Sequence, residues 1–478
     1  MTATCRLGNL LGHLRRPPGL HETVTKQGLL ARASTSAAQA TAIKDSYKIV
    51  IVGGGNASGY ACMELIGSGI KSHEVAMITE EPVPPYERPA LTKAYMHPPE
   101  AKVRARLPGF YTCAGWGKDK QTLQWYTDHG IDVLTETKVT KIDAKNCSLK
   151  TNTGISLTYE KLLFATGTRA IMANEIGLED SFHNLFTVRS EKDAADLVSY
   201  LETSEISKAV VIGGGYIGME CAAILAGWKN VQSIDMVFPE SHLMERLFPV
   251  EVADWMEENL KKRGINIIKG VTVEKTIGGD GVLTAVQLSN GSVIETNLVI
   301  AGLGAKPNSE LLQGQVNISS DGGIEVDECL RSSNSSIFSC GDAASFPHKY
   351  FDDQRHMRFE HIDNCRLSAV HAAKSMLGKP EAYVYVPFFY SRLFEYGAEP
   401  VVFNFYGNQL APDGSQLDLE CFSDTLRIGA FWLDSKRVVR GALICNGSQE
   451  NYEEISMLVK NNTVLEKGRV PASLLKSW

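Results

Sequence analysis

Residues 47–60 read Tyr-Lys-Ile-Val-Ile-Val-Gly-Gly-Gly-Asn-Ala-Ser-Gly-Tyr. The stretch opens with short, mostly β-branched and apolar residues, which are typical of a central parallel strand. Gly53 and Gly55 then allow a tight turn in which the backbone can approach a phosphate group closely. The helical residues 61–66 follow, and the positive end of that helix points at the phosphate. The stretch therefore predicts the strand, turn and first helix of a dinucleotide-binding fold.

Two further features complete this unit. Ser58 stands where the third glycine of the pattern G-x-G-x-x-G is expected, and its small side chain still permits close packing. Residues 74–79 are expected to form a second strand, which ends at Glu80 and Glu81. An acid at that strand end can accept both hydroxyl groups of an adenosine ribose. Strand, glycine turn, helix, strand and acid in this order make a strong pattern.

The same unit occurs a second time. Residues 208–212 are a strand-like run that leads into Gly213-Gly214-Gly215-Tyr216-Ile217-Gly218, in which all three glycines of the pattern are present. A helical stretch follows, and the next strand ends at Glu240. From Gly53 to Glu81 is 28 residues, and from Gly213 to Glu240 is 27. The duplication predicts two dinucleotide sites.

Two other strand ends indicate what the sites hold. Residues 162–167 form a strand that ends in Thr166-Gly167, and residues 336–344 form one that stops at Gly341-Asp342. Asp342 is placed to bond the ribityl chain of a flavin. In this order the glycine units, the Thr-Gly turn and the Gly-Asp box resemble the two-dinucleotide-binding flavoprotein family. The likeness covers nearly everything from Tyr47 onward.

The resemblance implies an α/β fold with two Rossmann-like domains, one for FAD and one for NAD, and a C-terminal α+β interface domain. Its expected organisation is residues 45–168 for the first part of the FAD domain, 169–295 for an inserted NAD domain, and 296–377 for the second part of the FAD domain. Residues 378–478 form the remaining domain, which contains aromatic, strand-like runs.

The cysteines narrow the type of reductase. The chain has 10 cysteines but no CxxC pair, so a disulfide framework, a zinc site and the redox-active pair of disulfide reductases are not expected. In their place stands the loop Pro84–Lys93, in which Arg88 and Lys93 can neutralise a pyrophosphate and carry the chain beneath a flavin. Electrons are therefore expected to pass directly from flavin to acceptor.

Four segments suggest the acceptor. The loop Pro84–Lys93, residues 107–113 and the C-terminal runs 358–369 and 387–392 resemble the monodehydroascorbate reductase family, particularly its organelle-targeted plant form. In that family the arginines matching Arg366 and Arg392 bind the anionic radical, and the tyrosine matching Tyr390 lies between substrate and flavin. The sequence departs from the family at Asn364-Cys365, where His-Ala is usual. The departure puts the local helix packing in doubt.

The resemblance and the glycine units together give the expected cofactor contacts; no metal is expected. Residues expected to contact FAD are Gly53, Gly55, Asn56, Ala57, Ser58, Glu81, Arg88, Lys93, Thr166, Gly167, Asp342, Ile362 and Tyr390. Residues expected to contact NAD are Gly213, Gly215, Tyr216, Ile217, Gly218, Glu220, Glu240, Arg246, Gly304, Glu360 and His361. His361 is expected either near the nicotinamide or as a structural histidine.

The N-terminus and the charge bear on location and partners. Residues 1–44 carry six basic residues and one acid among small and hydroxylated residues, the composition of a plastid or mitochondrial transit peptide. A disordered tail is the alternative. The net charge of -7 speaks against nucleic acid as a partner and suits a small-molecule substrate. No membrane span is expected, and the oligomeric state is left open.

Two other functions share much of this pattern. A ferredoxin- or rubredoxin-type reductase passes electrons to a small acidic carrier and needs a basic docking face near the flavin. An NADH-sensing interaction protein that resembles apoptosis-inducing factor is the second alternative, and the acidic balance gives it no support.

The nicotinamide preference yields a prediction. A carboxylate at Glu240 favours the free 2′-hydroxyl of NADH and repels the 2′-phosphate of NADPH, although Arg246 follows closely and can reach a phosphate. Replacing Glu240 with a neutral or basic residue is expected to improve the use of NADPH, measured as the ratio of kcat/KM for the two cofactors. Unchanged discrimination would count against this role.

Overall fold

The first glycine turn connects the central strand of a mixed sheet to a buried helix. In this computed structural model, which describes residues 43–112, 120–348, 355–397, 399–411, 413–423, 427–471 and 474, strand β1 spans Ser46–Val52 and helix α1 spans Asn56–Gly67. The predicted strand and helix are therefore confirmed. The predicted transit peptide lies almost wholly outside the described residues, as does Cys113.

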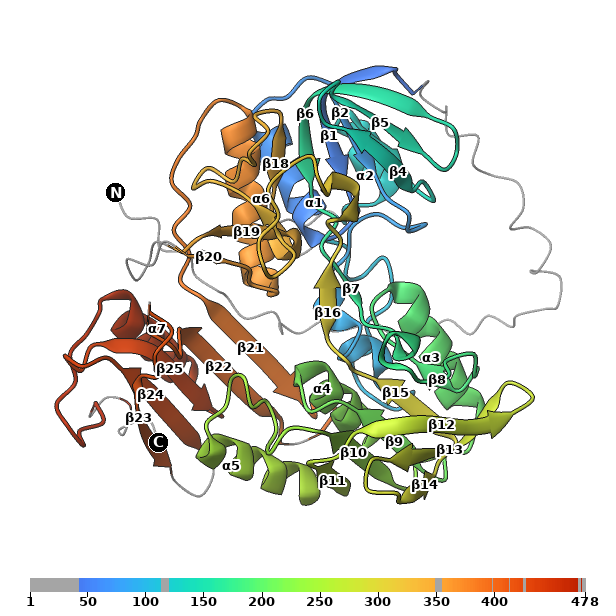
Figure 1. Cartoon of the computed structure of the whole chain (residues 1–478), viewed down its shortest axis with the longest axis vertical. Coiled ribbons are helices and arrows are strands. Elements are labelled where there is room, and N and C mark those ends of the chain that lie inside the picture. Colours follow the sequence, from blue (N-terminus) through green and yellow to red (C-terminus); the bar gives the residue numbers. More distant parts are fainter. Residues whose placement is uncertain are drawn as a thin grey trace, which may run out of the picture. The chain divides into compact units, whose positions relative to one another are not determined.

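The first sheet has the strand order β3-β2-β1-β6-β5-β4, and β18 pairs with β6 (Figure 1). Its strands are β1, β2 (Val75–Ile78), β3 (Ile131–Leu134), β4 (Val139–Asp143), β5 (Ser148–Thr151), β6 (Ser156–Phe164) and β18 (Ile337–Ser339). Helix α1 lies beside α6 (Ile362–Met376), and α2 (Leu123–Asp128) follows the long connection after β2. Strand β18 and helix α6 come from far along the chain, so an intervening segment interrupts this unit.

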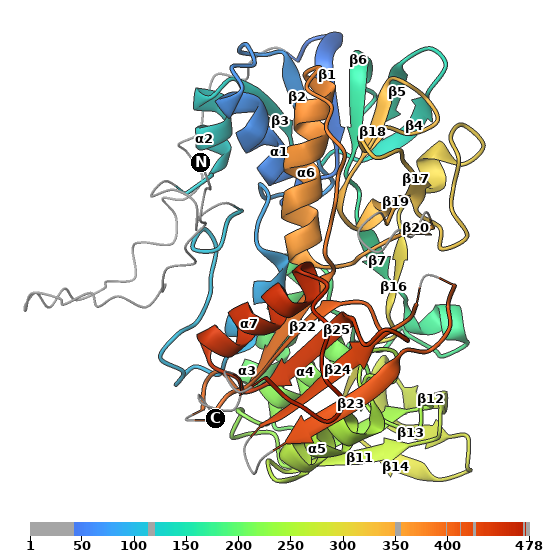
Figure 2. The same cartoon turned by 90° about the vertical axis from the view of Figure 1, so that its left-hand side faces the viewer.

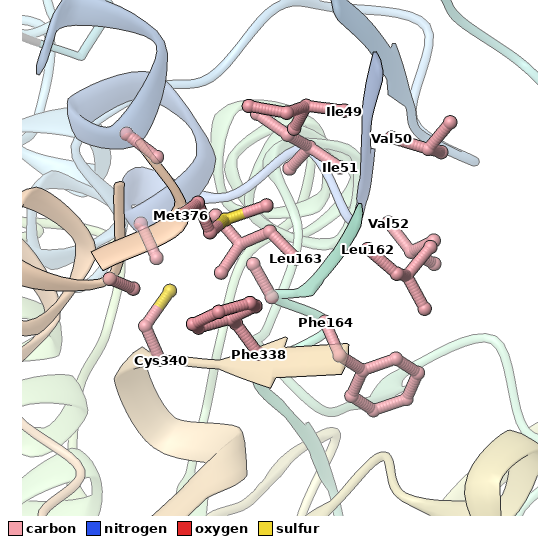
Figure 3. Close-up of a cluster of buried hydrophobic side chains, with 14 of the residues drawn as sticks. Ile49, Val50, Ile51, Val52, Leu162, Leu163, Phe164, Phe338, Cys340 and Met376 are labelled. Atoms are coloured by element: carbon pink, nitrogen blue, oxygen red, sulfur yellow. The ribbon is translucent and has the colours of Figure 1, made fainter. Parts of the chain in front are cut away.

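The core of this unit is built from alternating side chains (Figure 3). Ile49, Ile51 and Leu163 point to the side on which Met376 of α6 lies, whereas Val50 and Val52 point to the opposite face. All five are at most 3% exposed. A strand that is apolar on both faces must be covered on both sides, which is why the predicted run of β-branched residues sits in the middle of the sheet.

The second glycine unit builds a separate five-stranded sheet, with the order β11-β10-β9-β15-β8. Its strands are β8 (Leu185–Phe186), β9 (Ala209–Ile212), β10 (Ile234–Phe238), β11 (Ile265–Lys269) and β15 (Leu298–Ala301). The helices of this segment are α3 (Glu191–Thr203), α4 (Tyr216–Leu225) and α5 (Val250–Lys261). A hairpin sheet of β12 (Val273–Gly279), β13 (Val282–Leu288) and β14 (Val293–Glu295) follows β11. The repeat of the sequence pattern is thus a repeat of structure.

Short strands connect the two units. Strands β7 (Thr168–Ala170) and β16 (Ala305–Pro307) pair antiparallel where the chain leaves the first unit and returns to it. A small sheet of β17 (Ile324–Glu325), β19 (Ala344–Pro347) and β20 (His356–Met357) precedes α6. The two connections between the units are therefore held together by backbone hydrogen bonds between β7 and β16.

The C-terminal segment forms a five-stranded antiparallel sheet with the order β21-β22-β25-β24-β23 (Figure 1). Figure 2 shows β22, β25, β24 and β23 of this sheet from another side. Its strands are β21 (Phe388–Leu393), β22 (Val401–Gly407), β23 (Asp418–Ser423), β24 (Ile428–Leu433) and β25 (Val439–Cys445). Helix α7 (Gln449–Lys460) packs on β22 and β25, whereas α4 and α5 contact β21 and β24. The predicted α+β interface character is confirmed, because this sheet is built against the second unit.

None of the helices within the described ranges has the length and apolar character that crossing a bilayer requires.

Candidate active site

The parallel register brings the sequence motifs of the first unit to one edge of its sheet. Val52 at the end of β1 pairs with Ile78 of β2 and with Phe164 of β6, and Phe164 pairs with Ser339 of β18. The four strands thus end level with one another. The residues that follow them, namely the first glycine turn, Glu81, Thr166-Gly167 and Asp342, therefore converge at the carboxyl edge, where ligands of open α/β sheets bind.

The second sheet repeats this arrangement. Ile212 at the end of β9 pairs with Val237 of β10 and with Ala301 of β15. The second glycine turn, Glu240 and Gly304 follow these strands and consequently meet at one edge. Spacing in the sequence and parallel register in the sheet together place every element of the second dinucleotide pattern.

The two glycine turns have nearly the same backbone conformation. Gly53 has a φ of 113° and Gly213 a φ of 118°, a region that L side chains rarely adopt. A Cβ atom at Gly53 would overlap the carbonyl oxygen of Ala165, and one at Gly213 would overlap that of Gly302. These glycines are required for the close approach of neighbouring strands as well as for the turn.

The helices that follow the turns start without a capping side chain. Both α1 and α4 begin without a side-chain cap and without an acidic residue in the first turn, unlike every other α-helix in the described part of the chain. Uncapped N–H groups and the positive end of a helix bind anions such as phosphate. The two helix ends fit the pyrophosphate groups of two dinucleotides.

One continuous cavity of about 1070 Å³ joins the two sheet edges. Its volume lies at the upper end of the ~300–1,000 Å³ range of ligand pockets. Its walls contain most of the residues predicted to bind cofactors: Gly53, Gly55, Asn56, Ala57, Glu81, Arg88, Lys93, Thr166, Gly167, Gly213, Gly215, Tyr216, Ile217, Glu220, Glu240, Arg246, Gly304, Asp342, Glu360, His361, Ile362 and Tyr390. The cavity size and its two glycine turns suit two dinucleotides.

Four predicted residues lie outside the cavity wall. Ser58 donates a hydrogen bond to the carbonyl of Gly53 (2.6 Å), and Gly218 packs so closely that a Cβ atom would overlap the carbonyl oxygen of Gly213. Both residues support the turns from behind. Arg366 and Arg392 lie beyond the cavity near Tyr390 and are described below.

Glu81 is held by two neighbouring side chains. Its carboxylate accepts hydrogen bonds from the Tyr86 hydroxyl (2.6 Å) and from the guanidinium of Arg88. Arg88 also donates to the carbonyl of Arg189 (3.0 Å) and lies beside Gly55. The loop Pro84–Lys93 therefore carries a cation to the first glycine turn, and it orients Glu81 at the same time.

Glu240 and Arg246, near the end of β10 in the second unit, are not held by other described side chains as Glu81 is. Glu240 and Arg246 both line the cavity, and neither side chain has a hydrogen-bond or ion-pair partner within the described residues. Glu360, by contrast, pairs with Arg358, which also donates to the carbonyl of Asp342 (3.2 Å). Glu240 and Arg246 are thus available to a ligand.

His361 caps helix α6 and sits among aromatic rings. Its ring centroid lies 5.3 Å from each of those of Phe388, Phe389 and Tyr390. Nδ1 faces the backbone N–H of Asp363, and Nε2 faces that of Tyr390 (3.3 and 3.4 Å). Burial, assisted by the positive charges of Lys93 and Arg366, lowers the pKa of His361 to about 3. The imidazole is therefore neutral at physiological pH.

Arg366 belongs to a network that the sequence reasoning missed. Its guanidinium donates to Glu87 (2.9 Å) and lies over the ring of Tyr60, at 5.4 Å from the centroid. Glu87 also accepts hydrogen bonds from Asn56 and Tyr60, both at 3.0 Å. Glu87 lies within the quoted loop Pro84–Lys93, but nothing in the sequence marks it as the partner of Arg366.

The side chain of Arg392 is more exposed than that of Arg366 and has one ion-pair partner among the described residues. It lies on β21, where Phe388, Tyr390 and Arg392 share one face of the sheet because side chains alternate along a strand. Its Nε pairs with Glu395 (2.7 Å), and half of the side chain is exposed (50%). A guanidinium has five N–H donors, so each arginine keeps donors for an anion.

Asn364 and Cys365 stand at the one predicted departure from the family, and they fit the helix. Asn364 is fully buried, donates to the carbonyl of Phe359 and accepts a hydrogen bond from the Tyr383 hydroxyl, both at 2.9 Å. The thiol of Cys365 packs against Gly341. Burial raises the pKa of the Cys365 thiol and raises that of Cys340 to about 12, so both thiols are protonated. The local packing is therefore intact.

Comparison with known proteins identifies the class of this molecule. Residues 47–374 match the family model described as pyridine nucleotide-disulphide oxidoreductase. The putidaredoxin reductase–putidaredoxin complex has the same fold, with a TM-score of 0.73 and 24% identity over 87% of this chain and 93% of that chain. A NAD-dependent persulfide reductase from A. fulgidus has a TM-score of 0.74 and 21% identity over 89% and 80% of the two chains. Fold and site define an oxidoreductase that uses FAD and NAD(P)H.

The C-terminal segment narrows the class. Residues 386–471 match the model described as the C-terminal domain of monodehydroascorbate reductase 3-like proteins. Monodehydroascorbate reductase 4 of Arabidopsis thaliana is 40% identical over 86% of this chain and 82% of its own length. The monodehydroascorbate reductase of Pisum sativum is 37% identical over 88% of this chain and 96% of its own. The chain belongs to the monodehydroascorbate reductase family.

His361 gives a pH prediction. The native pKa of about 3 lies below the ~6.5 of an unfolded histidine, so the unfolded state binds more protons between these values. The contribution of His361 to stability is complete above pH 6.5 and is lost as the pH falls toward 3. His361→Asn should flatten the fall in unfolding free energy between pH 6.5 and 4.5 by up to ~1.4 kcal/mol per pH unit.

Urea unfolding of the FAD-loaded protein at a series of pH values measures this slope. The matched control is His129→Asn, at the exposed histidine that directly follows α2. Equal slopes for wild type and His361→Asn would contradict a neutral, buried imidazole.

Proposed function

We propose that this chain reduces the monodehydroascorbate radical to ascorbate at the expense of NADH, with FAD as the carrier. The observation that carries this proposal is the continuous cavity, which receives two uncapped helix ends and is bordered by Tyr390, on the strand face that also carries Arg392. FAD, when bound, accepts two electrons from the nicotinamide and can deliver them one at a time to a radical.

We propose specific tasks for the residues. Residues 45–168 and 296–377 would hold FAD, residues 169–295 would hold NADH, and residues 378–478 would complete the substrate face. Arg88 and the first turn of α1 would neutralise one pyrophosphate, and α4 would bind the other. The carboxylate of Glu240, which has no protein partner among the described residues, would accept the ribose hydroxyls of NADH.

The substrate is a small anion, and we propose that Arg366 and Arg392 bind it beside Tyr390. Each arginine uses one nitrogen for a glutamate partner and keeps other N–H donors. Glu87 fixes the guanidinium of Arg366, because Asn56 and Tyr60 hold that carboxylate in turn. A pre-oriented guanidinium loses little conformational freedom on binding an anion. The neutral imidazole of His361 leaves the positive charge of the site to the arginines.

An assay with two acceptors tests the function. Ascorbate with ascorbate oxidase generates the radical, and NADH oxidation is followed at 340 nm and compared with that supported by ferricyanide. We expect rapid oxidation with the radical. Activity with ferricyanide and none with the radical would leave only a general electron-transfer function. Activity restricted to an iron–sulfur carrier protein would favour the alternative of a carrier-protein reductase.

Arg366→Ala should lower kcat/KM for the radical by about 10- to 100-fold, since charge-assisted hydrogen bonds contribute ~1.5–3 kcal/mol. The rate of flavin reduction by NADH should stay within about threefold. Arg331→Ala is the matched control, because Arg331 also forms an ion pair, with Asp327, but lies outside the cavity wall. An equal loss in both variants would contradict a substrate role.

We propose that residues 1–44 direct the protein to a plastid or a mitochondrion. Relatives with this name in Oryza sativa and Arabidopsis thaliana are described as chloroplastic and as chloroplastic/mitochondrial, while others are peroxisomal. Residues 1–44 fused to a fluorescent protein should reach one of these organelles in plant cells, and a cytosolic signal would contradict the proposal.

A further inference from the structure

Glu220 is a buried carboxylate on which three donors converge. Its side chain is 3% exposed and lies in α4, the helix after the second glycine turn. Oε1 accepts hydrogen bonds from the ammonium group of Lys93 (2.7 Å) and from the hydroxyl of Ser391, and Oε2 accepts one from the hydroxyl of Thr92. Ser391 and Thr92 are themselves buried, at 0% and 5% exposure.

These donors come from distant parts of the chain. Thr92 and Lys93 lie on the loop after β2, and Ser391 lies on β21 in the C-terminal sheet. The contact between Ser391 and Glu220 spans 171 positions in the sequence. All three chain segments therefore meet at one carboxylate, beside the cavity that joins the two dinucleotide sites.

Ser391 also occupies a particular side of its strand. Because side chains alternate along β21, Ser391 points away from the face that carries its neighbours Tyr390 and Arg392. Phe389 lies on the same side as Ser391, and its ring contacts that of Tyr216 in α4, with the centroids 5.2 Å apart. Phe389 and Ser391 thus fasten β21 to α4, while the opposite face of the strand carries Tyr390 and Arg392.

The hydroxyl groups of Thr92 and Ser391 stabilise the buried carboxylate of Glu220 and do not merely fill space. A buried carboxylate needs charge-assisted hydrogen bonds to stay ionised and fixed, and the loss of one donor leaves part of its desolvation uncompensated. Lys93 alone bonds to one oxygen and leaves the carboxylate free to rotate about its terminal torsion. Donors on both oxygens remove that freedom and so fix the Lys93 ammonium group as well.

We propose that Ser391, together with Thr92, is a positioning residue that holds Glu220 against Lys93 where the nicotinamide and flavin sites meet. Through its hydrogen bond to Glu220, Ser391 also fixes the position of β21, the strand that carries Tyr390 and Arg392, against α4. The inference rests on the proposed placement of NADH beside α4, but it does not depend on the identity of the final electron acceptor.

Two substitutions remove one donor each. Ser391→Ala deletes the hydroxyl with little change in volume, and Thr92→Val is nearly isosteric. Each should lower the rate constant of flavin reduction by NADH about tenfold, measured by stopped flow at 450 nm without any acceptor, since each variant loses one hydrogen bond to a charged group. Each should also weaken NAD⁺ binding about threefold or more in calorimetry, a readout that needs no turnover.

The matched control is Ser332→Ala, which removes the hydroxyl of a buried serine that bonds only to the backbone of Asn334. This variant should leave both the rate constant and NAD⁺ binding unchanged, even if its thermal stability falls. If Ser391→Ala does not fold, Thr92→Val carries the test alone. Flavin reduction within twofold of wild type in the folded variants would overturn the proposal.

A double-mutant cycle separates positioning from simple packing. If Ser391 acts through Glu220, adding Ser391→Ala to Glu220→Gln should slow flavin reduction by less than about twofold beyond Glu220→Gln alone. Independent effects that multiply would overturn the proposal. These measurements use only NADH and flavin, so they can succeed even if the radical is not the substrate.

Discussion

The rest of the molecule depends on the left-handed backbone at Gly53 and Gly213. At each point the chain leaves a central parallel strand, passes under a neighbouring carbonyl group and enters a helix within three residues. A Cβ atom at either glycine would overlap that carbonyl, so no other residue permits the same approach. The turns leave two helix ends uncapped, and the parallel register of each sheet brings every other motif level with them. One cavity between two anion-binding helix ends is the result.

The carboxylates Glu87 and Glu220, of which Glu220 is buried, then connect the parts of the chain that these turns organise. Glu87 ties the start of α1 to Arg366 of α6, and Glu220 ties α4 to the loop after β2 and to β21. A buried carboxylate is stable only when its oxygens are supplied with donors, so its partners cannot move independently. The cofactor sites and the proposed substrate face are consequently held by these two sets of polar contacts, and the neutral His361 lies against the ring of Tyr390.

Several features could be predicted because their signals are local. The run from Tyr47 to Gly55 fixes strand and turn through side-chain shape and backbone freedom, and the structure confirms both. Gly218 and Ser58 lie outside the cavity wall and support the turns from behind, and the pattern G-x-G-x-x-G does not separate packing from contact. Their contact with a cofactor stays a prediction. Asn364 stood as a departure, and only its buried hydrogen bonds to Phe359 and Tyr383 show that the helix accommodates it.

The sequence alone determined the duplicated dinucleotide units and the family, and most of the residues that it predicted to bind cofactors line the cavity, because strand, turn and helix signals act over a few neighbouring residues. Only the tertiary structure decided which charges pair. Arg366 meets Glu87 across 279 positions, and Ser391 meets Glu220 across 171. Sheet register and the packing of β21 on α4 decide which of these side chains meet. Neither of them produces a pattern that can be recognised in the sequence. Electrostatic partners are set by distance in space, and the folded backbone alone fixes that distance.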